Sequence, residues 1–153
     1  MGTRSLTKVI TTWEDTKGKK QRKPITCMYR QYDGYLRGHG NDLAEFLQPF
    51  TIVNGIGLTE EKKIANGMDC LAAQMIAHFK DGPGNIYLMH PDTDDCGEEY
   101  IYEVNMNEGG ELIITCHDVY NKAVIFWGSS TELIEKVLNI LDDNDMLINS
   151  IIE

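Results

Sequence analysis

Residues 100–127 read YIYEVNMNEGGELIITCHDVYNKAVIFW, and this stretch decides the fold. Three short runs in it are rich in β-branched and aromatic residues, which favour strands: Tyr100–Met106, Glu111–His117 and Ala123–Trp127. The connections Asn107–Gly110 and Tyr120–Lys122 have the length and composition of hairpin turns. The stretch therefore predicts three strands joined by tight turns, as in an antiparallel sheet.

Further strands are expected on the N-terminal side of this stretch. Ser5–Trp13 and Ile25–Arg30 are strand-like and should form a hairpin, and Asn85–Met89 is a shorter strand-like run. The connection within the hairpin, residues 14–23, is basic and carries Lys17, Lys19, Lys20, Arg22 and Lys23. This basic tip has two interpretations: a solvated turn that blunts a sheet edge, or an electrostatic contact with an anionic partner.

Two or three helices are expected between these strands. Asn41–Phe50 repeats apolar residues at helical spacing, with Asn41 as a good N-cap and an end at Pro49. Met68–Lys80 carries one continuous apolar stripe and stops at a Gly-Pro-Gly sequence. Residues 51–67 are ambiguous, although a short helix capped by Thr59 would fit them.

A final helix is expected after the last strand. Ser129 and Glu132 have the spacing of a capping box, in which each side chain bonds to the backbone of the other. Apolar residues then recur at helical spacing from Leu133 to Leu141. The tail, residues 142–153, is acidic and then apolar, which fits either more helix or an ordered strap.

The order of these elements predicts an α+β fold. A chain of 153 residues, 42% hydrophobic and 25% charged, is typical of one globular domain with its own core. We therefore expect a single α+β domain over residues 1–153. It should contain an antiparallel sheet of about five to six strands, with roughly two to four helices packed on one face.

Charge is distributed unevenly along the chain. Residues 1–40 have a net charge of +6 and residues 41–153 a net charge of −16, which gives −10 in total. Such a strongly acidic body argues against non-specific binding of nucleic acid by the whole molecule. It still permits a local anion-binding site within the first third of the chain.

The sequence also predicts the cellular compartment. No apolar run approaches the roughly 20 residues that span a bilayer, and the first residues lack the apolar core of a signal peptide. The four cysteines form no C-x-x-C pair. We expect a cytoplasmic protein with reduced thiols and no membrane contact, in which Cys27 and Cys116 fill the core and Cys70 and Cys96 are also unpaired.

The candidate binding site is the block Tyr29–Gly40, which lies between a strand-like and a helix-like segment. Its glycines would let the backbone approach a ligand, and the following helix would offer unpaired N–H groups to an anion. Arginines add bidentate contacts to phosphate or carboxylate, and tyrosines can stack on a base. The predicted ligand-binding residues are Arg4, Tyr29, Arg30, Tyr32, Asp33, Tyr35, Arg37, Gly38, His39 and Gly40. The alternative interpretation is structural, with Asp33 and Gly34 forming a turn between strand and helix.

Other site chemistries are not favoured. Residues 92–103 resemble a calcium-binding loop in four places, but Cys96 replaces an oxygen ligand and Pro91 precedes the loop. The four histidines are dispersed without metal-binding spacing, and no serine lies in a nucleophile motif. We therefore expect no metal, no cofactor and no covalent catalysis.

Three segments resemble a family of small proteins from tailed phages and prophages. These are the opening Met1–Leu6, the block Tyr29–Gly40 with its Y-R-Q-Y-D-G-Y and G-H-G sequences, and the later Asp95–Tyr102. Members of that family begin M-G-T-R-S and usually have proline where this chain has Leu36. The resemblance spans most of the chain and implies a phage setting and action inside the host cytoplasm. It implies no particular activity.

Three functional hypotheses follow. The first is a phage accessory protein, for host takeover or counter-defence, that acts by binding and sequesters a nucleotide-like anionic ligand. The second is an acidic protein–protein inhibitor that mimics nucleic acid against a host protein, using the acidic residues 92–99. The third and least favoured is a small phosphodiesterase-type hydrolase with His39 as general base and Asp33 as its orienting group. A homo-oligomer would suit any of them, since a second subunit would complete a small site.

Overall fold

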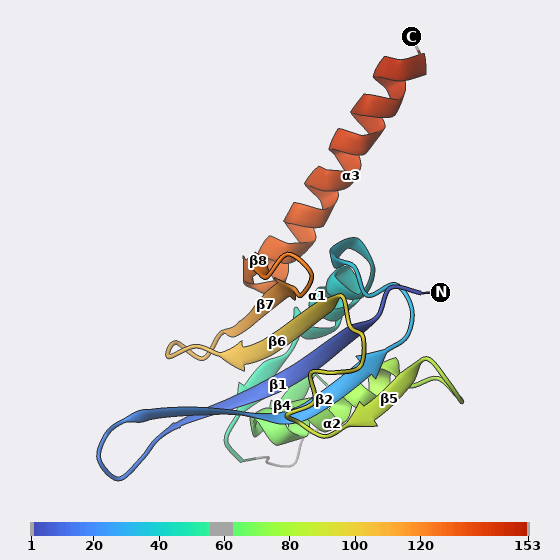
Figure 1. Cartoon of the computed structure of the whole chain (residues 1–153). Helices are drawn as coiled ribbons and strands as arrows, with labels where there is room; N and C mark the ends of the chain where they lie inside the picture. Colours follow the sequence, from blue (N-terminus) through green and yellow to red (C-terminus); the bar gives the residue numbers. More distant parts are fainter. Residues whose placement is uncertain (1, 56–62, 153) are drawn as a thin grey trace.

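The fold is α+β and is built on one six-stranded sheet (Figure 1). The structure is a computed structural model that describes residues 2–55 and 63–152, with side chains up to Leu141. The helix expected at Thr59 lies outside these residues. The strands follow the order β5 (Ile86–Met89), β2 (Lys20–Arg30), β1 (Ser5–Glu14), β6 (Tyr100–Met106), β7 (Leu112–Asp118) and β8 (Ala123–Gly128). The predicted fold class is confirmed, and the predicted strands agree closely with those observed, with one correction. β2 begins at Lys20 and not at Ile25, so part of the segment predicted as the hairpin connection is strand paired with β1.

One pairing in this sheet is parallel. β1 and β6 run in the same direction, in register from Ser5 opposite Tyr100 to Val9 opposite Val104. All other pairs are antiparallel, so the sheet is mixed rather than wholly antiparallel as expected. After β2 the chain forms the first two α-helices and then β5, which pairs with β2 at one edge of the sheet. It then crosses to the other side of β1, where β6 pairs with β1. A pairing between segments so far apart has no turn between them that would predict it.

A second, small sheet lies in the part of the chain that the sequence left ambiguous. β3 (Thr51–Val53) and β4 (Ile64–Asn66) pair in parallel. β4 leads directly into α2 (Gly67–Phe79), whose position confirms the helix predicted over Met68–Lys80. The strands were missed because each has only three residues, too short for a period-2 pattern to be recognised.

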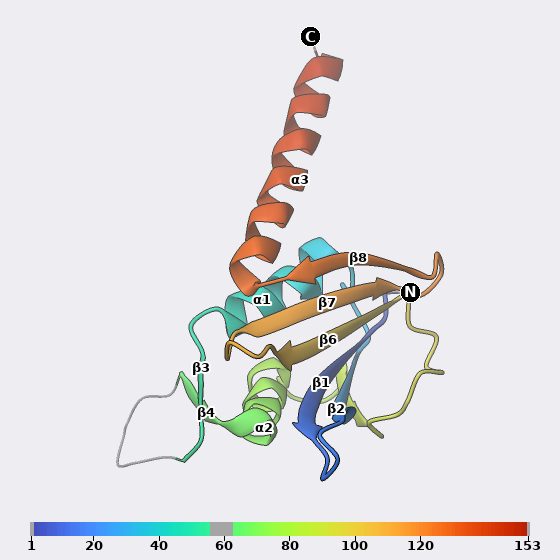
Figure 2. The same ribbon diagram turned by 90° about the vertical axis from the view of Figure 1, so that its left-hand side faces the viewer.

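The helices and the main core lie on one face of the sheet (Figures 1 and 2). A π-helical turn, η1 (Leu36–Gly40), runs into α1 (Asn41–Leu47), and α3 (Ser130–Ile152) follows β8. Buried side chains from α1, α2 and the start of α3 pack on sheet residues in one cluster, including Leu43, Leu47, Leu71, Met75, Leu133, Met28, Tyr102 and Ile114. Both strand cysteines, Cys27 and Cys116, are fully buried as predicted.

The predicted cap of α1 is wrong. The Asn41 side chain does not cap the helix but donates to Oε1 of Glu45, 3.2 Å away. The helix begins without a break from the π-helical turn, since Gly40 before it already has helical backbone angles. As a result, α1 has no exposed N-terminus of the kind that binds anions.

The capping box of α3 is confirmed. The Ser129 backbone N–H donates to Oε1 of Glu132, and the Glu132 N–H donates to Oγ of Ser129, each at 3.2 Å. Leu133 and Val137 then anchor the first turns of the helix in the core. Beyond them α3 runs away from the body, past the edge of the sheet formed by β8 (Figures 1 and 2). Among the described helices, none is both long and apolar enough to cross a membrane.

Replacing Ser129 by alanine should destabilise the protein by about 1 kcal/mol, because an N–H group of α3 loses its acceptor. Replacing it by aspartate should preserve stability, since aspartate is an equally good N-cap. Urea unfolding followed by circular dichroism measures both. Equal losses in the two variants would show that the cap does not contribute to stability.

Candidate functional site

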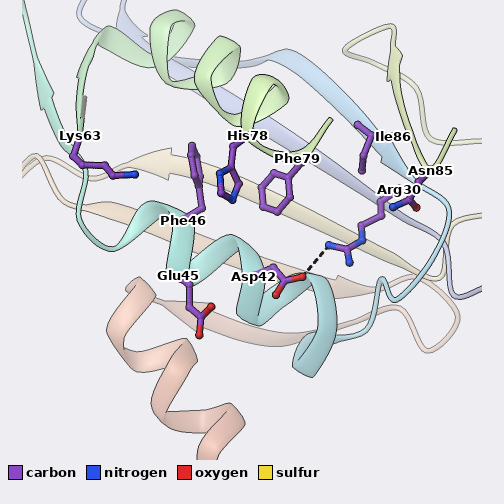
Figure 3. A pocket seen from close by; sticks show the side chains of 9 residues that line it. All are labelled: Arg30, Asp42, Glu45, Phe46, Lys63, His78, Phe79, Asn85 and Ile86. Carbon is purple, nitrogen blue, oxygen red and sulfur yellow. Dashed lines mark hydrogen bonds and ion pairs between the residues drawn. The ribbon is translucent and has the colours of Figure 1, made fainter. Parts of the chain in front are cut away.

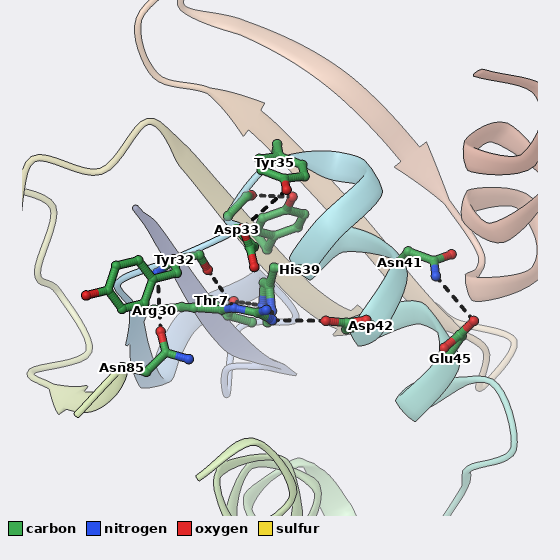
Figure 4. A network of polar contacts seen from close by, with 12 residues as sticks. Thr7, Arg30, Tyr32, Asp33, Tyr35, His39, Asn41, Asp42, Glu45 and Asn85 are labelled. Atoms are coloured by element: carbon green, nitrogen blue, oxygen red, sulfur yellow. Dashed lines mark hydrogen bonds and ion pairs between the residues drawn. The ribbon is translucent and has the colours of Figure 1, made fainter. Parts of the chain in front are cut away.

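His39 is the structural centre of the block that the sequence singled out. Its ring is fully buried, with Nε2 2.6 Å from Oγ1 of Thr7 on β1 and Nδ1 2.9 Å from a guanidinium nitrogen of Arg30 on β2 (Figure 4). The rings of Phe79 and Tyr102 meet it edge-on, each with centroids 5.1 Å apart. A single side chain thus joins the π-helical turn to three strands, β1, β2 and β6, and to α2.

These contacts fix the protonation state of His39. Arg30 has only donors, so Nδ1 must accept, and Nε2 therefore carries the proton and donates to Thr7. Burial and the neighbouring Arg30 charge lower the pKa of His39 from its usual value near 6.5 to about 3. The ring is neutral at physiological pH. The expected pairing with Asp33 is not formed, since the Asp33 carboxylate instead accepts from the Tyr35 hydroxyl at 3.2 Å.

The glycines of the block are required by packing. A Cβ on Gly38 would overlap the backbone carbonyl oxygen of Asp33, and one on Gly34 would lie 2.7 Å from Cβ of Ser5. A Cβ on Gly40 would meet Leu36 and the Tyr102 hydroxyl at 3.1 Å. The same hydroxyl donates to the Gly34 carbonyl at 2.7 Å. These close contacts explain the glycines without reference to a ligand.

The backbone N–H groups of this turn are also used within the chain. Those of Gly38 and Gly40 donate to the Tyr35 carbonyl, that of His39 donates to the Asp33 carbonyl at 2.7 Å, and that of Asn41 donates to carbonyls of the turn. The turn therefore does not present the free donors that the sequence suggested.

The structure divides the predicted binding residues into separate places. Arg30 and His39 are in contact, whereas Tyr35, Asp33 and Arg37 form a separate group in which the Arg37 guanidinium lies over the Tyr35 ring. Tyr32 is exposed. Gly38 and Gly40 belong to the π-helical turn. Arg4 and Tyr29 lie elsewhere: Arg4 is beside Gly97, and Tyr29 belongs to a small cluster with Leu6 and Cys27.

Arg30 is the predicted residue that reaches a cavity. Its side chain is only 12% exposed. Nε donates to the Tyr32 carbonyl at 2.8 Å, while one terminal nitrogen contacts both His39 and, at 3.2 Å, the Asp42 carboxylate. Within the described residues, the other terminal nitrogen has no hydrogen-bond partner. A nearly buried guanidinium with unused donors can bind an anion strongly.

The cavity beside Arg30 has a volume of about 380 Å³ and lies between α1 and α2 (Figure 3). Phe46 of α1 and His78 of α2 stack in its wall, with ring centroids 4.6 Å apart and planes at 28°. Other lining residues are Asp42, Glu45, Lys63, Phe79, Asn85 and Ile86. The cavity is thus lined by aromatic rings together with two cationic and two carboxylate side chains.

Sequence reasoning missed most of this cavity. Phe46 and Phe79 belong to the apolar stripes of the predicted helices, so helical periodicity assigns them to the core. His78 is one of four dispersed histidines and carries no motif that would mark it as a site residue. Asn85 has a positive φ of 57°, which places it beside the end of β2, where its Oδ1 accepts from the Tyr32 N–H. Only the spatial approach of α1 to α2 brings these residues together.

The basic hairpin tip is largely engaged with its own surroundings. Lys20 forms an ion pair with Glu108, Arg22 lies 2.5 Å from Glu103, and the Lys23 ammonium lies over the Trp13 ring. Lys20, Arg22 and Lys23 therefore lie in β2 and not in the turn where the sequence placed them. Their contacts within the chain favour a solvated segment over a contact with an anionic partner, although exposed pairs of this kind contribute little stability.

The acidic loop between β5 and β6 combines exposed and buried carboxylates. Asp92, Asp94 and Asp95 are exposed, while Glu98 is buried and accepts from the Cys96 N–H at 3.1 Å. No group of three or more metal-ligating side chains occurs within residues 2–55 and 63–141. Burial raises the pKa of Cys27 to about 11 and of Cys116 to about 12, so both thiols are protonated at neutral pH.

No protein-family model, curated protein or solved structure matches this chain.

Replacing Gly38 by alanine should destabilise the protein by about 1–3 kcal/mol, because the added methyl group overlaps backbone that cannot move aside. Gly109→Ala is the matched control, since a Cβ there meets only a side-chain oxygen at 3.4 Å. Denaturant unfolding of both variants measures the difference. Equal stabilities would show that the turn can relax around a side chain.

His39 should make stability depend on pH. Its pKa is about 3 when folded and near 6.5 when unfolded, so the unfolded chain binds the extra proton between these values. The contribution of His39 to the free energy of unfolding is fully present above pH 6.5. It decreases as the pH falls, by up to about 1.4 kcal/mol per pH unit. His39→Gln should be less stable at pH 7 but lose less between about pH 6.5 and about pH 4. The measurement is the free energy of unfolding of both proteins at several pH values. An equal decrease for the two proteins across that range would contradict the assignment.

Proposed function

We propose that this protein acts by binding a small, nucleotide-like anion in the cavity between α1 and α2, with Arg30 as the anion contact. The observation that carries the proposal is the Arg30 guanidinium. It is almost buried, it belongs to a residue that lines the cavity, and one of its terminal nitrogens has no hydrogen-bond partner among the described residues. A phosphate oxygen would supply the missing acceptor.

The rest of the cavity suits an organic ligand better than inorganic phosphate. Phe46, His78 and Phe79 provide an aromatic wall for a planar ring. Glu45 provides an acceptor for a sugar hydroxyl, as acidic residues do in dinucleotide sites. A volume of about 380 Å³ falls in the usual range for small-molecule sites.

The charges around the cavity restrict the ligand further. Among the described lining residues, Arg30 and Lys63 are positively charged and Asp42 and Glu45 are negatively charged, so these four formal charges cancel. Such a site attracts a polyphosphate weakly, because no net positive field draws it in. A nucleoside monophosphate or a cyclic phosphodiester, with fewer charges to neutralise, fits best.

The setting of this activity rests on the resemblance to phage proteins. We infer an accessory protein of an infecting phage that works in the host cytoplasm by sequestering such a ligand. Binding alone suffices for that role, and His39, which is buried and uses both ring nitrogens in the fold, is poorly suited to act as a general base.

Calorimetric titration with nucleoside monophosphates, triphosphates and cyclic nucleotides tests the proposal. We expect a monophosphate or cyclic phosphodiester to bind and Arg30→Gln to weaken binding more than about tenfold, because a charged hydrogen bond is lost. His78→Ala should weaken it roughly fivefold through the lost ring contact, with little effect on folding since His78 is exposed.

Two further variants make the test specific to Arg30. Asp42→Asn should strengthen binding, because it removes a carboxylate beside the guanidinium that repels an anionic ligand. Arg37→Gln, which removes an equal charge outside the cavity, should leave affinity unchanged. The proposal fails if no nucleotide binds at concentrations up to about 1 mM, or if Arg37→Gln weakens binding as much as Arg30→Gln.

A further inference from the structure

The distal half of α3 extends beyond the body of the protein. The helix is 23 residues long, roughly 35 Å. Among its described side chains, those of the first turns pack on the core. Leu133 and Val137 are buried, whereas Leu138 and Leu141 are 54% and 42% exposed. Figures 1 and 2 both show the rest of the helix continuing past the sheet.

The sequence of α3 carries one apolar seam along the whole helix. In a seven-residue repeat labelled a to g, three positions form this seam, and all of their residues except Asn144 are apolar. They are position d (Leu133, Ile140, Leu147), position a (Val137, Asn144, Ile151) and position e (Ile134, Leu141, Ile148). The first repeat faces the core of its own chain, and the later repeats continue the same pattern where the helix has left the body. A seam of this kind is characteristic of helices that pack against other helices.

We propose that α3 pairs antiparallel with α3 of a second copy of this chain, over residues 140–152. In this register Ile140 lies opposite Ile151 of the second copy, and Asn144 lies opposite Leu147. The two bodies then lie at opposite ends of the paired helices. Each seam continues beyond its own body, so the pairing does not require either body to move.

Charge is compatible with self-association in this register. The distal half of α3 contains Asp142, Asp143 and Asp145, and two copies would repel if these residues faced each other. Only Asp143 flanks the seam, at position g, and the antiparallel register places it opposite Ser150 of the second copy. On the other flank, Leu141 lies opposite Ile148. Like charges are thus kept apart, while apolar residues meet.

The size of the interface predicts a weak dimer. About two heptads from each chain are fewer than the roughly 20–30 residues that a standard interface takes from each partner. Asn144 at a seam position further lowers affinity while restricting the allowed register. We therefore expect a monomer–dimer equilibrium that depends on concentration.

Sedimentation equilibrium of the full chain from about 1 µM to about 1 mM tests this inference. The average mass should rise from 17.3 kDa toward twice that value. Leu147→Asp with Ile151→Asp should raise the dimer dissociation constant more than about 100-fold, because two charges enter the seam. The matched control is Met146→Asp with Asn149→Asp, which adds the same charge at positions c and f and should leave dimerisation intact.

A gain in affinity provides a second test that does not depend on a disruptive variant. Asn144→Ile should lower the dissociation constant by about tenfold, since it removes the polar residue from the seam. A wild-type chain that stays monomeric throughout the concentration range would overturn the proposal. So would a dimer unaffected by the paired aspartates at 147 and 151, or one weakened equally by those at 146 and 149.

Discussion

The contact between His39 and Arg30 is the interaction on which the rest of the structure depends. A buried neutral imidazole accepts from a guanidinium and donates to Thr7, and so connects the π-helical turn to the two adjacent strands β1 and β2. Because the His39 ring is fully buried, water cannot hydrogen-bond to its nitrogens, and Arg30 and Thr7 supply these hydrogen bonds instead. Protonation of His39 would put two cations 2.9 Å apart, so the network has one stable charge state.

This network also explains the composition of the block around it. The turn must bring His39 against β1 and β2 while following the backbone of Asp33 closely, and only glycine fits at Gly38. Gly34 and Gly40 leave room for Ser5 and for Tyr102 in the same way. The glycines and the histidine of this loop are therefore explained by close packing within the fold. Among the described residues, one terminal nitrogen of Arg30 is a donor that the fold leaves unused.

Much of the fold could be predicted because its signals are local. Hairpin turns, β-rich runs and the reciprocal bonds of Ser129 and Glu132 depend on residues a few positions apart. The parallel pairing of β1 with β6 depends on segments separated by most of the chain, and no local pattern encodes it. Asn41 shows a different kind of failure. A good cap residue does not cap when the preceding turn is already helical, because no free N–H groups remain for its side chain.

The candidate site was only partly predictable for a related reason. Arg30 was recognised because arginine in a glycine- and tyrosine-rich block is unusual, but its cavity is formed by Phe46, His78 and Phe79, which helical periodicity assigns to the core. Leu36 illustrates how the turn itself tolerates change. It is the first residue of the π-helical turn, where proline would also fit, since a first helical residue needs no N–H partner. Here leucine instead buries its side chain in the main core, so the position contributes packing where proline would contribute rigidity.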